Sequence, residues 1–136
     1  PEASINYWQP KKDDSLYHVN YLGTIINSLY NINYQADERR YRVFKTKEEA
    51  QKYAEYIKAE ETLRRVIAEA NEGWLPDWDG WEANYVIGMV GKYKYIKVLT
   101  YCDDKVFPNF MYIKSKKLAE KLIENYEAEF KTYLSY

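Results

Sequence analysis

Cysteine and histidine are nearly absent: the 136 residues include one of each. A lone thiol, Cys102, excludes a disulfide within these residues and is typical of a reducing compartment, so we expect a cytoplasmic location. The neighbouring Asp103 and Asp104 carry negative charge that disfavours a reactive thiolate. With His18 as the single imidazole, neither a zinc site nor a histidine-activated nucleophile is expected. We therefore expect no metal, no other cofactor and no catalytic residues.

Long apolar runs and glycine-rich loops are also missing. No run approaches the roughly 20 residues that a membrane span requires, and the first residues do not form a charged and then apolar leader. Gly88 and Gly91 flank an expected hairpin and are not followed by a helix, so they do not form a phosphate-binding loop. The formal net charge is −1, which is neither that of a DNA-mimicking polyanion nor that of a generally basic protein. A charged partner would therefore be met by a local patch.

Aromatic side chains are abundant, with 16 tyrosines, four tryptophans and four phenylalanines. Such rings combine a large apolar face with a polar handle, which suits half-buried sheets and binding surfaces. Filling the core of a small two-sheet protein is the simpler interpretation. An exposed aromatic contact surface is the alternative.

The sequence contains an internal match at two expected helix starts. Residues 44–57 align without a gap on residues 113–126, and in each segment an apolar residue and a lysine precede a hydroxyl residue, Thr46 or Ser115. Such hydroxyls accept hydrogen bonds from the first turn of a helix. Trp8-Gln-Pro10 and Trp74-Leu-Pro76 extend the match upstream. The match predicts two copies, residues 6–71 and 72–136, each too small to bury its own apolar face and therefore packed together as one globular unit.

Each copy has the pattern of three strands followed by a helix. Alternating and β-branched residues predict strands, turn residues separate them, and apolar residues three and four apart predict the helices. The expected strands are 16–22, 24–30 and 38–44 in the first copy and 85–90, 92–101 and 110–113 in the second; the expected helices are 47–71 and 116–134. We therefore predict an α+β fold of two tandem βββα repeats, with antiparallel sheets packed against two long helices.

The most unusual segment runs from Glu72 to Glu82 and interleaves tryptophans with carboxylates. One interpretation is a partner-binding loop, in which rings supply contact area and acids select a basic partner. The alternative is a linker whose tryptophans clamp the two copies. The segment has too few ligands for a calcium loop. The candidate partner-binding residues are Asp77, Trp78, Asp79, Trp81 and Glu82.

Basic residues cluster twice, between tyrosines. Such a face could hold a phosphate backbone while rings stack on bases. The alternative is that lysine and arginine simply solvate strands and protect their edges. The candidate nucleic-acid-binding residues are Arg39, Arg40 and Arg42 in the first copy and Lys92, Lys94 and Lys97 in the second.

The segments Glu72-Gly-Trp-Leu-Pro-Asp-Trp78, Tyr112 to Ile123 and Arg40 to Ala50 resemble small, largely uncharacterised accessory proteins of phages and prophages. The likeness covers most of the chain, and Trp81 departs from the usual form. It implies an accessory role in the cytoplasm of the bacterial host, such as that of anti-CRISPR and other anti-defence proteins.

We therefore expect a non-enzymatic inhibitor that binds a host protein or ribonucleoprotein of a defence system. The first alternative is a nucleic-acid-binding module that uses a sheet, similar to the three-strand-plus-helix modules of phage integrases. The second is a sponge that sequesters a nucleotide immune signal in an aromatic pocket. The sequence leaves the identity of the partner and the oligomeric state open.

Overall fold

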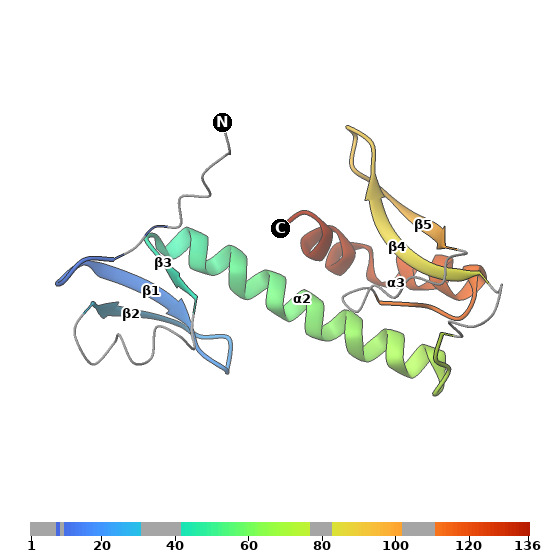
Figure 1. The fold of residues 1–136 in the computed structure, drawn as a ribbon, viewed down its shortest axis with the longest axis horizontal. Helices are drawn as coiled ribbons and strands as arrows, with labels where there is room; N and C mark the ends of the chain where they lie inside the picture. Colours follow the sequence, from blue (N-terminus) through green and yellow to red (C-terminus); the bar gives the residue numbers. More distant parts are fainter. Residues whose placement is uncertain (1–7, 9, 31–41, 77–82, 102–110) are drawn as a thin grey trace. The chain divides into compact units, whose positions relative to one another are not determined.

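The fold comprises two helices and two antiparallel sheets in the part of the chain that the structure describes, residues 8, 10–30, 42–76, 83–101 and 111–136 (Figure 1). The structure is a computed structural model. It confirms the α+β class, while the finer architecture of tandem βββα repeats stays a prediction. None of the helices in the described residues is both long and apolar enough to cross a bilayer. The elements in chain order are β1 (Ser15–Val19), β2 (Ile25–Leu29), β3 (Val43–Phe44), α2 (Lys47–Asn71), β4 (Asn84–Val90), β5 (Tyr95–Tyr101) and α3 (Lys116–Leu134).

The chain divides into two compact units, residues 1–57 and 58–136, which we call unit one and unit two. The division lies inside α2, so residues 47–57 of this helix belong to unit one and residues 58–71 to unit two. The predicted copies, residues 6–71 and 72–136, are repeats of a sequence pattern. A division into compact units does not test whether the chain contains such repeats.

Unit one contains a three-stranded sheet in the order β2-β1-β3. The β1–β2 hairpin pairs Ser15 with Leu29 at one end and Val19 with Ile25 at the other, and β3 pairs with β1 through Tyr17 and Phe44. The start of α2 covers this sheet, because Val19, Phe44 and Ala50 form one buried cluster. Thr46 caps the helix as expected, since its hydroxyl accepts a hydrogen bond from the Glu49 N–H at 3.2 Å.

Unit two contains the β4–β5 hairpin, whose seven residue pairs run from Asn84 and Tyr101 to Val90 and Tyr95. Its core joins the second part of α2 to α3, with Ile87, Ile96 and Val98 of the hairpin packed against it. Ser115 caps α3 by accepting from the Leu118 N–H at 3.2 Å, which confirms the second predicted cap. The buried members of this core are Leu63, Val66, Ile67, Ile113, Ala119, Leu122 and Phe130.

Several predicted strand bounds differ from those observed. β5 begins at Tyr95 rather than at residue 92, because residues 91–94 form a turn. The third strand of the second copy is reduced, in the described residues, to one antiparallel bridge between Ile113 and Tyr85. β1 ends at Val19 rather than at residue 22, since Asn20 already begins the turn. The helix bounds 47–71 and 116–134 are confirmed.

Candidate functional site

The residues proposed from the sequence fall into three groups. Arg42 belongs to unit one, and Lys92, Lys94 and Lys97 belong to unit two, so the two basic surfaces are described separately. The candidate partner-binding residues Asp77, Trp78, Asp79, Trp81 and Glu82, and the candidate basic residues Arg39 and Arg40, lie outside the residues that the structure describes.

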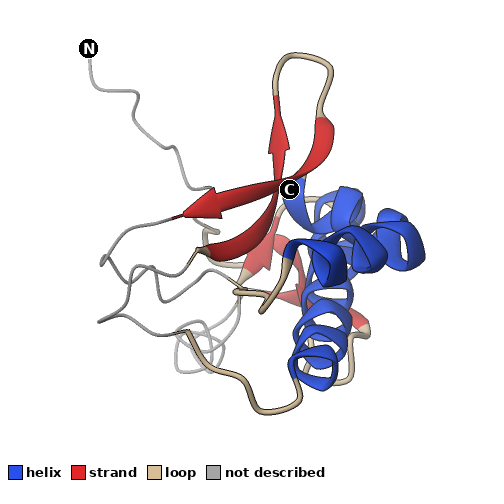
Figure 2. Cartoon of the chain, turned by 90° about the vertical axis from the view of Figure 1, so that its right-hand side faces the viewer, coloured by secondary structure: helices blue, strands red, loops and turns tan. Residues whose placement is uncertain are grey.

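The strongest candidate surface is the outer end of the β4–β5 hairpin. Its turn projects beyond the helices of unit two (Figures 1 and 2). Tyr93 in the turn and Tyr95 at the start of β5 are 69% and 65% exposed, and their ring centroids lie 6.1 Å apart with an interplanar angle of 57°. Because Tyr95 and Lys97 are two residues apart on a strand, their side chains share one sheet face. That face is opposite the one on which Ile96 and Val98 pack against the helical core.

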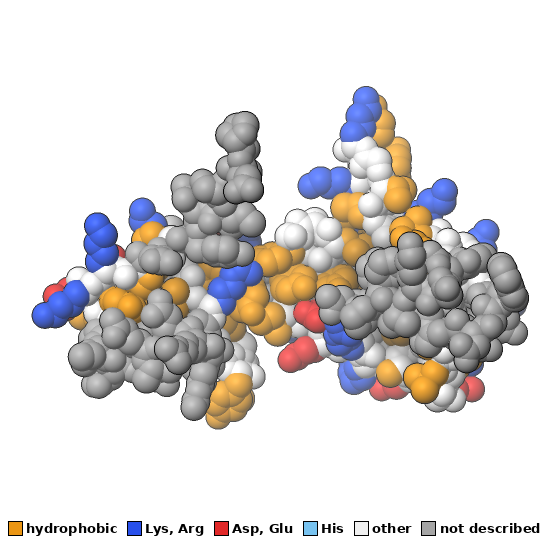
Figure 3. Space-filling view, in the orientation of Figure 1, with side chains coloured by type: hydrophobic (Ala, Val, Ile, Leu, Met, Phe, Trp, Pro, Cys, Tyr) orange, Lys and Arg blue, Asp and Glu red, His pale blue; other side chains and the backbone are white. Residues whose placement is uncertain are grey.

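This hairpin end is positively charged and has no compensating acid nearby in sequence. Residues 83–101 include three lysines and no aspartate or glutamate. The Lys92 ammonium nitrogen lies 4.8 Å from the centroid of the Tyr93 ring, a cation–π contact. In the described part of the chain, no carboxylate forms an ion pair with Lys92, Lys94 or Lys97. Figure 3 shows this end of unit two as basic side chains beside apolar ones.

The turn itself holds a lysine in an unfavourable backbone conformation. Gly91 and Lys94 both have positive φ, 73° and 54°, and the Lys94 N–H closes the turn by donating to the Gly91 carbonyl at 3.2 Å. Glycine adopts such angles freely, whereas a residue with a Cβ loses roughly 1–2 kcal/mol there. The fold is therefore less stable with lysine at position 94 than it would be with glycine. This cost favours a functional reason for the charge of Lys94.

Arg42 in unit one lies against two rings. Its guanidinium carbon is 5.3 Å from the ring centroids of both Phe44 and Tyr53, whose own centroids are 5.2 Å apart. Stacking on aromatic faces restricts the orientation of the guanidinium group. Arg42 is exposed and stays a candidate contact residue of unit one, whereas the hairpin lysines belong to unit two.

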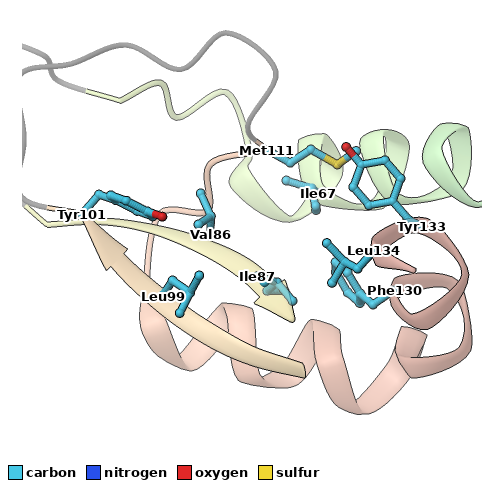
Figure 4. Close-up of a pocket in the computed structure, with 10 residues that line it drawn as sticks. Ile67, Val86, Ile87, Leu99, Tyr101, Met111, Phe130, Tyr133 and Leu134 are labelled. Carbon is cyan, nitrogen blue, oxygen red and sulfur yellow. The ribbon is translucent and has the colours of Figure 1, made fainter. Parts of the chain in front are cut away.

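Unit two also contains a pocket of about 200 Å³ (Figure 4). Apolar side chains of β4, β5 and α3 line it, including Val86, Leu99 and Phe130, and Tyr101 and Tyr133 contribute rings with a hydroxyl. The described lining includes no lysine, arginine or histidine, so it offers no charged partner for a phosphate group. This composition suits core packing or an apolar group better than the nucleotide signal of the sponge hypothesis.

Sequence reasoning missed the residue that fixes the segment before α3. Asn71, the last residue of α2, is buried; its side-chain amide donates to the Tyr112 carbonyl at 2.8 Å and its side-chain oxygen accepts from the Lys114 N–H at 3.1 Å. The side chain thus satisfies backbone groups on both sides of Ile113. The sequence pattern indicates Asn71 only as the end of a helix, because the partners of its side chain lie about 40 residues away in sequence.

Two further observations bear on chemistry. Burial raises the pKa of the Tyr133 phenol, Glu60 raises it further, and Arg64 acts in the opposite direction. Among the described residues, no three histidine, cysteine, aspartate or glutamate side chains are grouped so as to hold a metal ion.

Comparison with protein-family models, curated proteins and solved structures found no match to this chain.

Proposed function

We propose that this chain is a non-enzymatic binding protein whose contact surface is the outer end of the β4–β5 hairpin, and that single-stranded nucleic acid is its partner. The observation that supports this most strongly is the juxtaposition of two exposed tyrosine rings with three lysines that no described carboxylate neutralises. Ammonium groups attract phosphates, and exposed rings stack on unpaired bases. Single strands fit better than duplex because only their bases offer a free face to the rings.

Salt dependence separates the roles of the lysines and the tyrosines. Replacing Lys92, Lys94 and Lys97 together by alanine should lower the slope of log affinity against log salt by about 2, since each phosphate contact to a single strand contributes about 0.7. Replacing Tyr93 and Tyr95 by alanine should weaken binding by about 1–3 kcal/mol per lost base stack and leave the slope unchanged. Fluorescence anisotropy with a labelled single-stranded oligonucleotide at several salt concentrations measures both quantities.

A matched control removes the same charge elsewhere. Lys52, Lys58 and Lys121 are exposed helical lysines, so their triple alanine variant changes the net charge equally with little effect on helix propensity. The control should bind as wild type does. Equal loss in both triple variants, or wild-type binding that does not respond to salt, would contradict a nucleic-acid contact at the hairpin.

A second candidate function is inhibition of a host defence effector through a protein contact, in the accessory role that the resemblance to phage proteins implies. The observation that favours it is the β1–β2 turn of unit one, where Tyr21 and Leu22 are 86% and 72% exposed and thus offer an apolar contact. Trp78 and Trp81 stay candidates for the same contact. The test is phage plating on a host with an active defence system, where expression of the chain should restore plating. The double variant Tyr21→Ser with Leu22→Ser, or the double variant Trp78→Ala with Trp81→Ala, should abolish that effect at unchanged melting temperature.

We also propose that the two halves are copies of one βββα unit. Support comes from the pairing that precedes each capped helix: Phe44 pairs with Tyr17 of β1, and Ile113, its sequence counterpart, bridges Tyr85 of β4. The first strand of each hairpin therefore lies between its partner and the segment before the cap. If each half is such a unit and cannot bury its own apolar face, neither residues 6–71 nor residues 72–136 should fold alone, which circular dichroism of each excised copy tests.

A further inference from the structure

The outer edge of β2 is one of the two edges of the sheet in unit one. The sheet order β2-β1-β3 places β2 at the side, and in the described part of the chain no strand other than β1 pairs with it. An edge strand presents a row of N–H and C=O groups that another strand can pair with.

The hydrogen bonds that flank the hairpin identify the outward groups. Asn20 N–H donates to the Thr24 carbonyl at 3.0 Å, and Tyr30 N–H donates to the Asp14 carbonyl at 2.9 Å, so both of these pairs are of the hydrogen-bonded kind. Such pairs alternate along an antiparallel ladder with pairs that are not hydrogen-bonded. Ile25, Asn27 and Leu29 belong to the second kind, and their backbone N–H and C=O groups therefore point away from β1.

This edge lacks the usual protection. Proteins commonly protect edge strands with proline, or with lysine and other charged residues. Residues 15–36 contain no aspartate, glutamate, lysine, arginine or proline, and Leu29 at the end of β2 is 59% exposed. β5 in unit two, by contrast, carries Lys97 within the strand. The uncharged sequence around β2 favours pairing with another uncharged strand.

We propose that β2 pairs antiparallel with β2 of a second copy of this chain, about a two-fold axis at Asn27. In this register Asn27 faces Asn27 of the second copy, and Ile25 faces Leu29 in both directions. Every outward N–H and C=O of the three residues then has a partner, and the exposed Leu29 side chain lies beside an isoleucine across the new ladder. The interface is isologous, as expected for the commonest class of symmetric dimer.

A second copy fits better than a charged peptide because the edge offers no side-chain charge for selecting one. The outward residues of β2 can also pair with those of an identical strand. When a second β2 runs antiparallel to the first about Asn27, every outward residue of one strand lies opposite an outward residue of the other. A one-residue shift of this register would leave the outward groups of one strand opposite the inward groups of the other. The β1–β2 pairing therefore excludes a one-residue shift, and the register centred on Asn27 is the one that pairs all three outward residues of β2 with each other.

Charge substitution at the axis tests the proposal. Asn27 is exposed, and its backbone groups do not serve the β1–β2 ladder. Its side chain makes one exposed hydrogen bond, in which its oxygen accepts from the Ser15 hydroxyl at 2.8 Å, so Asn27→Lys and Asn27→Asp should both retain the fold. Each variant would place two like charges directly opposite each other, which destabilises the pair. The matched control is Thr24→Lys, which adds a charge at an exposed turn position beyond the paired segment.

Sedimentation velocity over a micromolar to millimolar range measures the result, with circular dichroism as the check on folding. We expect wild type and Thr24→Lys to double in mass with concentration, each Asn27 variant alone to stay monomeric, and an equimolar mixture of Asn27→Lys and Asn27→Asp to dimerise again. A wild-type chain that stays monomeric at all concentrations would overturn the proposal. So would a dimer that both Asn27 variants retain, because its contact must then lie elsewhere.

Discussion

The two hairpins of this chain have similar frames and different ends. Both join antiparallel strands through a turn that contains a glycine of positive φ, Gly23 at 80° and Gly91 at 73°. The β1–β2 turn is uncharged, presents Tyr21 and Leu22, and is held by Asn20, whose side chain accepts from the N–H groups of Leu22 and Thr24. The β4–β5 turn is cationic and places a lysine where a glycine would be more stable.

The two hairpins differ mainly in the residues of their turns. Strand pairing and the contact with a helix set the frame in each unit, and turn residues can then vary without disturbing the core. The uncharged turn and edge of unit one suit apolar and backbone contacts. The charged turn of unit two suits an anionic partner. The following substitutions test the comparison.

The largest expected effect concerns how each unit holds the segment before its capped helix. In unit one β3 pairs with β1 through two residues, whereas in unit two a single bridge at Ile113 is supported by the Asn71 side chain. Asn71→Ala removes both hydrogen bonds and leaves buried backbone groups unsatisfied, so unfolding free energy should fall by about 2–4 kcal/mol. Urea denaturation measures it, with the exposed Asn125→Ala as control, expected within about 0.5 kcal/mol of wild type. An equal effect of both variants would contradict the role of Asn71.

The next substitution removes the side chain that builds the uncharged turn. Asn20→Ala deletes the acceptor for two backbone N–H groups and should lower the stability of unit one by about 1–2 kcal/mol. Hydrogen exchange of the amides in residues 21–25 measures the local effect. Thr24→Ala, which keeps the same backbone bonds, should leave exchange unchanged. Unaltered exchange in Asn20→Ala would show that the turn does not depend on this side chain.

The third substitution separates stability from binding at the cationic turn. Lys94→Gly relieves the positive φ and should raise stability by about 1 kcal/mol, while it removes one cation and weakens binding to single-stranded nucleic acid. Lys94→Arg keeps both the charge and the strain, so it should resemble wild type in melting temperature and affinity. If Lys94→Gly gained stability and lost no affinity, the charge at this position would have no part in binding.

The smallest effect is a pH dependence confined to unit two. Burial, followed by Glu60, raises the folded-state pKa of Tyr133 above its ordinary value near 10. As pH rises above about 10, the unfolded chain loses this proton before the folded chain does, so stability falls until the folded-state pKa is passed. Tyr133→Phe should lack this contribution. Between pH 8 and pH 11 the melting temperature of the wild type should therefore fall relative to that of Tyr133→Phe, and parallel curves would contradict the raised pKa.

Helices, caps and the α+β class could be predicted from the sequence because they depend on local patterns. Thr46 and Ser115 are recognisable as caps, and apolar spacing fixed both helices. Strand ends were less predictable: Lys92 to Lys94 alternate with tyrosines as a strand would, yet Gly91 and the closing Lys94 bond make them a turn. The non-helical backbone at Tyr126 within α3 has no signature in the apolar stripe.

The candidate site was predictable only in part. The lysines of the hairpin were identified from the sequence, whereas Tyr93 and Tyr95 were not singled out, because among 16 tyrosines only the fold distinguishes exposed rings from buried ones. Asn71 escaped notice because its role depends on a contact distant in sequence. The proposed tryptophan loop, from Asp77 to Glu82, lies outside the described residues and stays a prediction.

The most direct test of the central claim compares both turns in one titration. Backbone amide chemical shifts of the isotopically labelled chain would be followed by NMR as an unstructured single-stranded oligonucleotide is added at low salt. We expect shifts at residues 91–97 that reverse when salt is raised, with residues 20–24 unaffected. Shifts confined to residues 20–24, or none at either turn, would contradict it.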